Sequence, residues 1–217
     1  MIDLIANYGD EILKGLLGTI MILVAGCLIG TPIGAAMAFL LISKRRYLQW
    51  PARAYVEIIR NTPFLIQAML LFAVLGVMRI RIDPMIVGTA AVAIYTTAYM
   101  AEIVRGALKA IPNGQWEAAS ALGLRPLRVF RLVILPQLLP SALPPSVNLY
   151  GTVAKETAFL SAVSVAELTF AGQVVIAQTF KVFEVWAIVG ALYLALILLI
   201  LAAAKRLDRG LDWAEHT

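Results

Sequence analysis

Long runs of apolar residues without a charge constrain this chain most. A helix of about 20 apolar residues spans the hydrocarbon core of a bilayer, and the run from Gly15 to Ser43 contains no Asp, Glu, Lys or Arg. The composition agrees, because 61% of the 217 residues are hydrophobic and only 14% are charged. A soluble domain carries roughly 25% charged residues. The sequence therefore predicts an all-α membrane protein.

Five transmembrane helices are predicted in one domain that covers residues 1–217. We place the spans at about 13–43, 54–78, 84–104, 144–165 and 185–204. The fourth span is expected to begin near Pro144, because Pro136 and Pro140 lack the backbone donor that a helix interior needs.

Basic residues orient these spans. Most of the Lys and Arg residues fall in 43–60, 105–131 and 205–217, and such residues collect in cytoplasmic loops of membrane proteins. Five spans with the N-terminus outside and the C-terminus in the cytoplasm satisfy all three clusters, although Arg79 and Arg81 fall on the outer side. This placement accounts for the net charge of +5, so we expect no nucleic-acid partner. The single cysteine, Cys27, excludes an intramolecular disulfide. With one cysteine and one histidine, the sequence predicts no metal cluster.

The segment 105–136 between the third and fourth spans is too polar to cross a membrane. Ala118 and Ala119 favour a helix, Gly123 suits a left-handed residue that ends it, and Pro126 suits the first turn of a second helix. Pro136 is expected to end that second helix. The pattern fits two alternatives: an amphipathic hairpin that anchors the chain at the membrane surface, or a knob whose small residues admit a partner.

The residues of this segment carry a resemblance. The string Glu117-Ala118-Ala119, with Gly123 four residues later and Val133-x-Leu135-Pro136 beyond it, resembles the EAA motif of ABC importer permeases. The whole chain, over about 12–208, resembles their polar amino acid branch. Further strings in the family order are Glu57-x-x-Arg60-Asn61-Thr62-Pro63-x-x-x-Gln67, Tyr99-x-x-Glu102-x-x-Arg105-Gly106, Ile111-Pro112-x-Gly114-Gln115, Leu143-Pro144-Pro145-x-x-Asn148 and Lys155-x-Thr157. The family usually has Gly at the position of Asn61 and Ser at that of Ala158.

The resemblance implies a transport subunit and not an enzyme. It implies five core helices, a second permease that is identical or paralogous, and two cytoplasmic ATPase subunits that bind the ATP and Mg. This chain would bind no cofactor itself. An extracytoplasmic binding protein would deliver a polar amino acid across the bacterial inner membrane, with lipid around the chain. The cytoplasmic coupling helix between spans 3 and 4 would comprise Glu117, Ala118, Ala119, Leu122, Gly123 and Leu124. Which amino acid is carried stays open.

Charged residues within the apolar spans suggest the substrate path. Lys155 and Glu156 interrupt the fourth span, and ionisable residues at membrane depth usually serve function. With Gln67 and Thr157 they are candidates to line a path for a zwitterionic substrate. The alternative is an ion pair that holds the bundle together, for example from Lys155 to Glu102 or Glu167.

Two repeated patterns leave further alternatives open. Glu57-x-x-Arg60 recurs as Glu102-x-x-Arg105 at the predicted cytoplasmic face, either as ordinary ion pairs or as part of an inner gate. The glycines of Gly26-x-x-x-Gly30-x-x-x-Gly34 permit close helix packing, either within the chain or between two subunits.

Two other classes of function compete with an importer permease. One is a membrane scaffold whose loop recruits a cytosolic partner, which the intramembrane Lys155 and Glu156 disfavour. The other is a self-contained secondary transporter, which a count of five spans and the lack of an inverted repeat disfavour.

Overall fold

The computed structural model describes residues 2–212, and all the regular structure in this range is helical. The elements are α1 (Ile2–Leu41), α2 (Arg46–Arg60), α3 (Phe64–Val77), α4 (Pro84–Ala110), α5 (Asn113–Ala121), α6 (Pro126–Val129), the π-helical η1 (Phe130–Ile134), α7 (Leu135–Glu156), the 3-10 helix η2 (Thr157–Val163), α8 (Leu168–Thr179) and α9 (Val182–Asp212). The predicted all-α class is confirmed for this range. Residues 1 and 213–217 of the predicted domain lie outside it.

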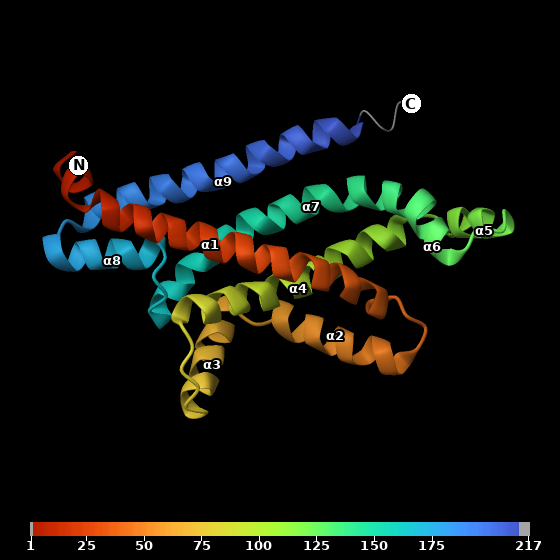
Figure 1. Cartoon of the computed structure of the whole chain (residues 1–217), viewed down its shortest axis with the longest axis horizontal. Coiled ribbons are helices and arrows are strands. Elements are labelled where there is room, and N and C mark those ends of the chain that lie inside the picture. The colour runs from red at the N-terminus through yellow and green to blue at the C-terminus, as the bar shows by residue number, and fades with distance from the viewer. Residues whose placement is uncertain (1, 213–217) are drawn as a thin grey trace.

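Most of the helices run along one common direction (Figure 1). By length and composition, four continuous helical stretches of the described chain can cross a membrane: Asp3–Leu41, Pro84–Ala110, Pro126–Val163 and Val182–Ala203. The pair α2 and α3 supplies a fifth if the two count as one span. Large apolar side chains on the outside of the bundle, such as Met21 and Leu28 on α1, are 64% and 71% exposed, as expected for a lipid-facing surface.

The second span is not the continuous helix predicted for 54–78. α2 and α3 meet at an angle of 109°, and α3 projects away from the other helices (Figure 1). The break falls at Asn61-Thr62-Pro63. Proline disfavours helical geometry in the residue before it, and Pro63 itself is extended with ψ 136°.

The fourth span begins much earlier than the predicted Pro144, and Pro136 does not end the preceding helix. Helical structure continues from Pro126 to Val163. In η1 the hydrogen bonds shift by one residue, so that the Leu135 amide donates to the carbonyl of Phe130, and the helix proceeds through Pro136. Pro136, Pro140 and Pro144 are four residues apart and share one face of α7, and Pro145 directly follows the last of them. Three of the four missing donors therefore fall along one line, so most of the helix keeps its hydrogen bonds.

The glycine stripe of α1 packs within the chain. Gly26, Gly30 and Gly34 lie directly against α4, where a Cβ added at any of them would come within 2.8 Å of an α4 atom. α1 makes its most extensive contact with this helix. The intrachain alternative is therefore the one that the structure supports.

A helix that the sequence did not predict, α8, lies at the end of the bundle where α1 begins (Figure 1). The first turns of α1, which also precede the predicted start at residue 13, contribute Leu4 and Ile12 to a small core with Leu168 and Val175 of α8. α9 completes this core with Val185 and Val189.

Candidate coupling and transport sites

The predicted coupling segment forms a short hairpin at one end of the molecule. α5 ends at Ala121, and Gly123 adopts φ +73°, a left-handed conformation that glycine adopts without steric penalty. The Leu124 amide donates back to the carbonyl of Ala119 over 3.4 Å, and Pro126 opens α6. The backbone thus has the predicted helix, glycine turn and start of a second helix, although the second helix continues past Pro136.

The six predicted coupling residues divide between two faces of this hairpin. Glu117, Ala118 and Leu122 are exposed, and Leu122 is 81% exposed. Ala119 is buried, and Leu124 packs against the main core. The inward pair fixes the hairpin to the bundle, and the outward residues with the Gly123 turn form a surface that a partner can contact.

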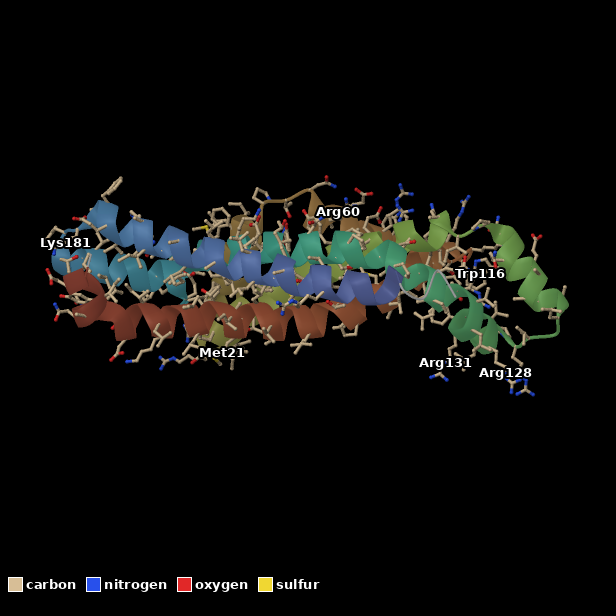
Figure 2. The ribbon with its side chains drawn as sticks, turned by 90° about the horizontal axis from the view of Figure 1, so that it is seen from above. Met21, Arg60, Trp116, Arg128, Arg131 and Lys181 are labelled. Atoms are coloured by element: carbon tan, nitrogen blue, oxygen red, sulfur yellow. The ribbon has the colours of Figure 1, made fainter. Side chains whose placement is uncertain are left out.

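Basic side chains flank the same surface. Arg128 and Arg131 extend from the hairpin end of the molecule, whereas Lys181 lies at the opposite end (Figure 2). Both arginines are exposed. The hairpin thus presents two exposed leucines, Leu122 and Leu127, with exposed arginines beside them.

A charge cluster joins α2 to α4. Glu102 forms a bidentate ion pair with Arg105, in which Nε donates over 2.8 Å, and it also lies 3.6 Å from Arg60 of α2. The Arg60 guanidinium lies 5.5 Å from the ring centroid of Tyr99. One carboxylate therefore holds two arginines, and one of them crosses between helices.

The other half of the repeated pattern behaves differently. Glu57 does not pair with Arg60. It accepts a hydrogen bond from Asn61 Nδ2 over 3.0 Å and lies 4.0 Å from Arg53. Glu57 and Glu102 nevertheless line one small polar pocket of about 160 Å³ between α2 and α4. The two copies of the pattern meet in space although they do not form matching pairs.

Lys155 and Glu156 are the last residues of α7, where the helix tightens into η2. Lys155 is exposed and Glu156 is half-buried. Neither of the predicted alternative pairs from Lys155 forms, because Glu102 is held by arginines and Glu167 has other partners. Thr157 is fully buried, and its hydroxyl donates to the carbonyl of Ala154 over 2.8 Å.

Gln67 braces the bend between α2 and α3. Its Nε2 donates to the carbonyls of Ile59 and Thr62 over 2.7 and 2.9 Å, and it contacts Thr62 Oγ1 at 2.8 Å. A helix end leaves carbonyls without partners, and the amide of Gln67 satisfies one at the end of α2. Its Oε1 is buried and has no partner in the described part of the chain.

Sequence reasoning missed the role of Glu167. This fully buried carboxylate caps α8, where it accepts hydrogen bonds from the Thr169 and Phe170 amides over 2.9 and 2.7 Å. The Tyr193 hydroxyl donates to it over 2.6 Å. An acidic residue directly before an apolar, helix-forming stretch is a cap signal that marks α8 in the sequence.

Comparison with known proteins relates this arrangement to a transport family. Residues 30–213 match the family model described as "Binding-protein-dependent transport system inner membrane component". The glutamine transport system permease protein GlnP of Escherichia coli is 35% identical over 204 residues, which cover 91% of each chain. The octopine transport system permease protein OccM of Rhizobium meliloti is 32% identical, over 86% of this chain and 78% of that protein.

A solved structure has the same fold. The crystal structure of an amino acid ABC transporter with histidines contains a chain that superposes with a TM-score of 0.86. It is 30% identical, and the alignment covers 94% of this chain and 96% of that one.

Proposed function

We propose that this chain is the permease subunit of a polar amino acid ABC importer. It belongs to the family of binding-protein-dependent transport system inner membrane components, and it is a multi-pass membrane protein. It lies in the bacterial inner membrane, receives the amino acid from an extracytoplasmic binding protein and pairs with a second permease. Two ATPase subunits, which bind the ATP and Mg, drive the passage of the substrate.

The hairpin of α5 and α6 is the proposed contact with the ATPase. The observation that supports this most directly is the exposure of Leu122 at the tip of a structured turn whose other face is anchored by Ala119 and Leu124. Burial of an exposed leucine contributes about 1.5–3 kcal/mol. A surface that is anchored on one side and apolar on the other transmits a rigid-body push from ATPase closure to the spans.

The orientation follows from the same contact. α1 begins at the end opposite the hairpin, and α9 finishes on the hairpin's side (Figure 1). If the hairpin faces the cytoplasm, the N-terminus is outside and the C-terminus is inside. The exposed Arg125, Arg128 and Arg131 support this orientation through the enrichment of basic residues in cytoplasmic loops.

Lys155 and Glu156 are the proposed contacts for the charged groups of the substrate. They stand at the junction of α7 and η2, and η2 also contacts α3 and α4. The cluster of Arg60, Glu102 and Arg105 lies further along α4 and is the proposed inner gate, because breaking the Arg60–Glu102 pair releases α2 from α4.

Co-purification tests the coupling contact. Glu117→Lys and Gly123→Asp are each expected to abolish retention of the ATPase by the tagged permease. Glu11→Lys is the matched control, since it makes the same charge reversal at an exposed position of α1 and should retain the ATPase fully. Retention by all three variants would refute the contact.

Uptake tests the substrate path independently. Lys155→Ala and Glu156→Ala are expected to reduce amino acid uptake or change its selectivity while the ATPase stays bound. Lys14→Ala, at an exposed site of α1, is the control. Normal uptake and unchanged selectivity in both variants would reject this path.

A further inference from the structure

A large cavity opens beside the coupling hairpin, where α1 ends and α4 continues. It has a volume of about 900 Å³ and lies between the connection from α1 to α2 and the junction of α4 and α5. Lys44 enters it from the first connection and Lys109 from the last turn of α4, and Trp116 enters from α5. Segments about 60 residues apart in the sequence thus share one cavity.

The polar part of this cavity favours an anion. Lys44 and Lys109 are both exposed, and neither forms an ion pair with any side chain that the structure describes. Lys109 also lines the adjacent polar pocket with Glu57 and Glu102. Both carboxylates already lie against arginines, Glu57 against Arg53 and Glu102 against Arg60 and Arg105. Two ammonium groups that share a cavity without a carboxylate partner attract a negatively charged group.

The apolar part of the cavity favours an acyl chain beside that anion. Ile42 lines it and is 37% exposed, so it offers open apolar surface. Leu41, Leu108 and Ile111 also line it, and each is less than 8% exposed, so these walls are fixed by the core. Leu41 is also the last residue of the membrane-spanning α1, which places the cavity at the level of lipid headgroups. The half-buried Trp116 suits this level, where indole rings are common.

We propose that this cavity binds an anionic phospholipid. Its phosphate contacts Lys44 and Lys109, and an acyl chain lies along Ile42. Basic pockets between membrane helices on the cytoplasmic side bind anionic headgroups in this way. A small free anion would leave the exposed side chain of Ile42 uncovered. The lipid would connect the end of α1 to α5, so its presence would stiffen the base of the coupling hairpin. The proposal requires the membrane placement of the chain and does not depend on which amino acid is carried.

Lipid titration of the full chain, purified in detergent with the subunits that accompany it, tests the proposal. Native mass spectrometry measures the retention of phosphatidylglycerol against phosphatidylcholine with the same acyl chains. A lysine near an anionic surface contributes about five-fold in affinity. Lys44→Gln is therefore expected to weaken phosphatidylglycerol binding about five-fold, and Lys44→Gln with Lys109→Gln about thirty-fold, with phosphatidylcholine binding unchanged.

Two control pairs separate the site from general surface charge and from misfolding. Arg45→Gln with Arg46→Gln removes two exposed charges from the same stretch of chain outside the cavity, and it should leave the retention within about two-fold. Lys44→Arg with Lys109→Arg should restore it. An equal loss in the Arg45 and Arg46 pair, or no restoration by arginine, would overturn the proposal. So would displacement of the lipid by glycerol phosphate at equal concentration, because that result identifies a site for a free anion.

Discussion

Replacing Gly30 with alanine should push α1 away from α4. A Cβ at this position would lie 2.7 Å from the carbonyl oxygen of Ala93 and 2.7 Å from Cβ of Thr96. Carbon atoms pack without strain at about 3.5–4.0 Å, so the helices must separate by roughly 1 Å. Neither neighbouring atom can rotate away, because one belongs to the backbone and the other is fixed to it. Overpacking of this kind destabilises by about 1–3 kcal/mol.

The matched control is Gly190→Ala on α9, where an added Cβ meets nothing within 4 Å. Alanine favours a helix over glycine by up to about 1 kcal/mol, so this variant should be as stable as the parent or more stable. Both variants are unfolded by titrating a denaturing detergent into a mild one and following circular dichroism. The free energy of unfolding of Gly30→Ala should be lower than that of Gly190→Ala by at least about 1 kcal/mol.

A different outcome would place the stripe elsewhere. If Gly30→Ala unfolds like Gly190→Ala but loosens the pairing of two permease subunits, the glycines contact a second subunit and the packing against α4 is not decisive. Size-exclusion chromatography of the two variants distinguishes these results.

Three other substitutions test the turns and caps. Gly123→Ala should lower ATPase retention more than Gly123→Asn, because the left-handed conformation costs alanine about 1–2 kcal/mol. Steric clash within the chain is not the cause, since a Cβ added at Gly123 meets nothing within 4 Å. The reverse order would mean that the ATPase requires the small size of glycine and not the left-handed turn. Gln67→Leu should lower the free energy of unfolding in detergent by about 1–3 kcal/mol, because the carbonyl of Ile59 loses a donor. Unchanged stability with lost uptake would favour a substrate contact. Glu167→Ala should lower the free energy of unfolding by about 1–3 kcal/mol, because α8 loses its cap and the Tyr193 hydroxyl keeps only its contact with the Thr169 hydroxyl. A loss below about 0.5 kcal/mol in the same assay would contradict the role of Glu167 as the cap of α8.

Features that depend on local backbone geometry were predictable from the sequence. The left-handed turn at Gly123 and the helix start at Pro126 follow from the conformations that these two residue types prefer. The stripe of Gly26, Gly30 and Gly34 indicated close packing, although only the structure identifies α4 as the partner.

The prolines of α7 were misleading because each was considered alone. One proline in a helix interior costs about 3 kcal/mol, and this reasoning places the start of the span at Pro144. The cost depends on where the missing donors fall. Pro136 follows a π-helical turn that already shifts the hydrogen-bond register, and three of the four prolines repeat at intervals of four residues on one face. Spacing as well as number therefore decides whether such a segment remains helical.

Polar residues near the spans have two competing uses, and the sequence does not distinguish them. From the sequence, Gln67 resembles a substrate ligand. In the structure, the bend at Pro63 leaves carbonyls that need a donor, and the amide of Gln67 donates to those of Ile59 and Thr62. Thr157 is likewise engaged by a backbone carbonyl. Lys155 forms no ion pair with the described side chains. Because a charge within the membrane is costly without a partner, the proposed substrate would supply the partner of Lys155. The proposed path therefore rests on Lys155 and its neighbour Glu156, and the parts of Gln67 and Thr157 in it stay predictions.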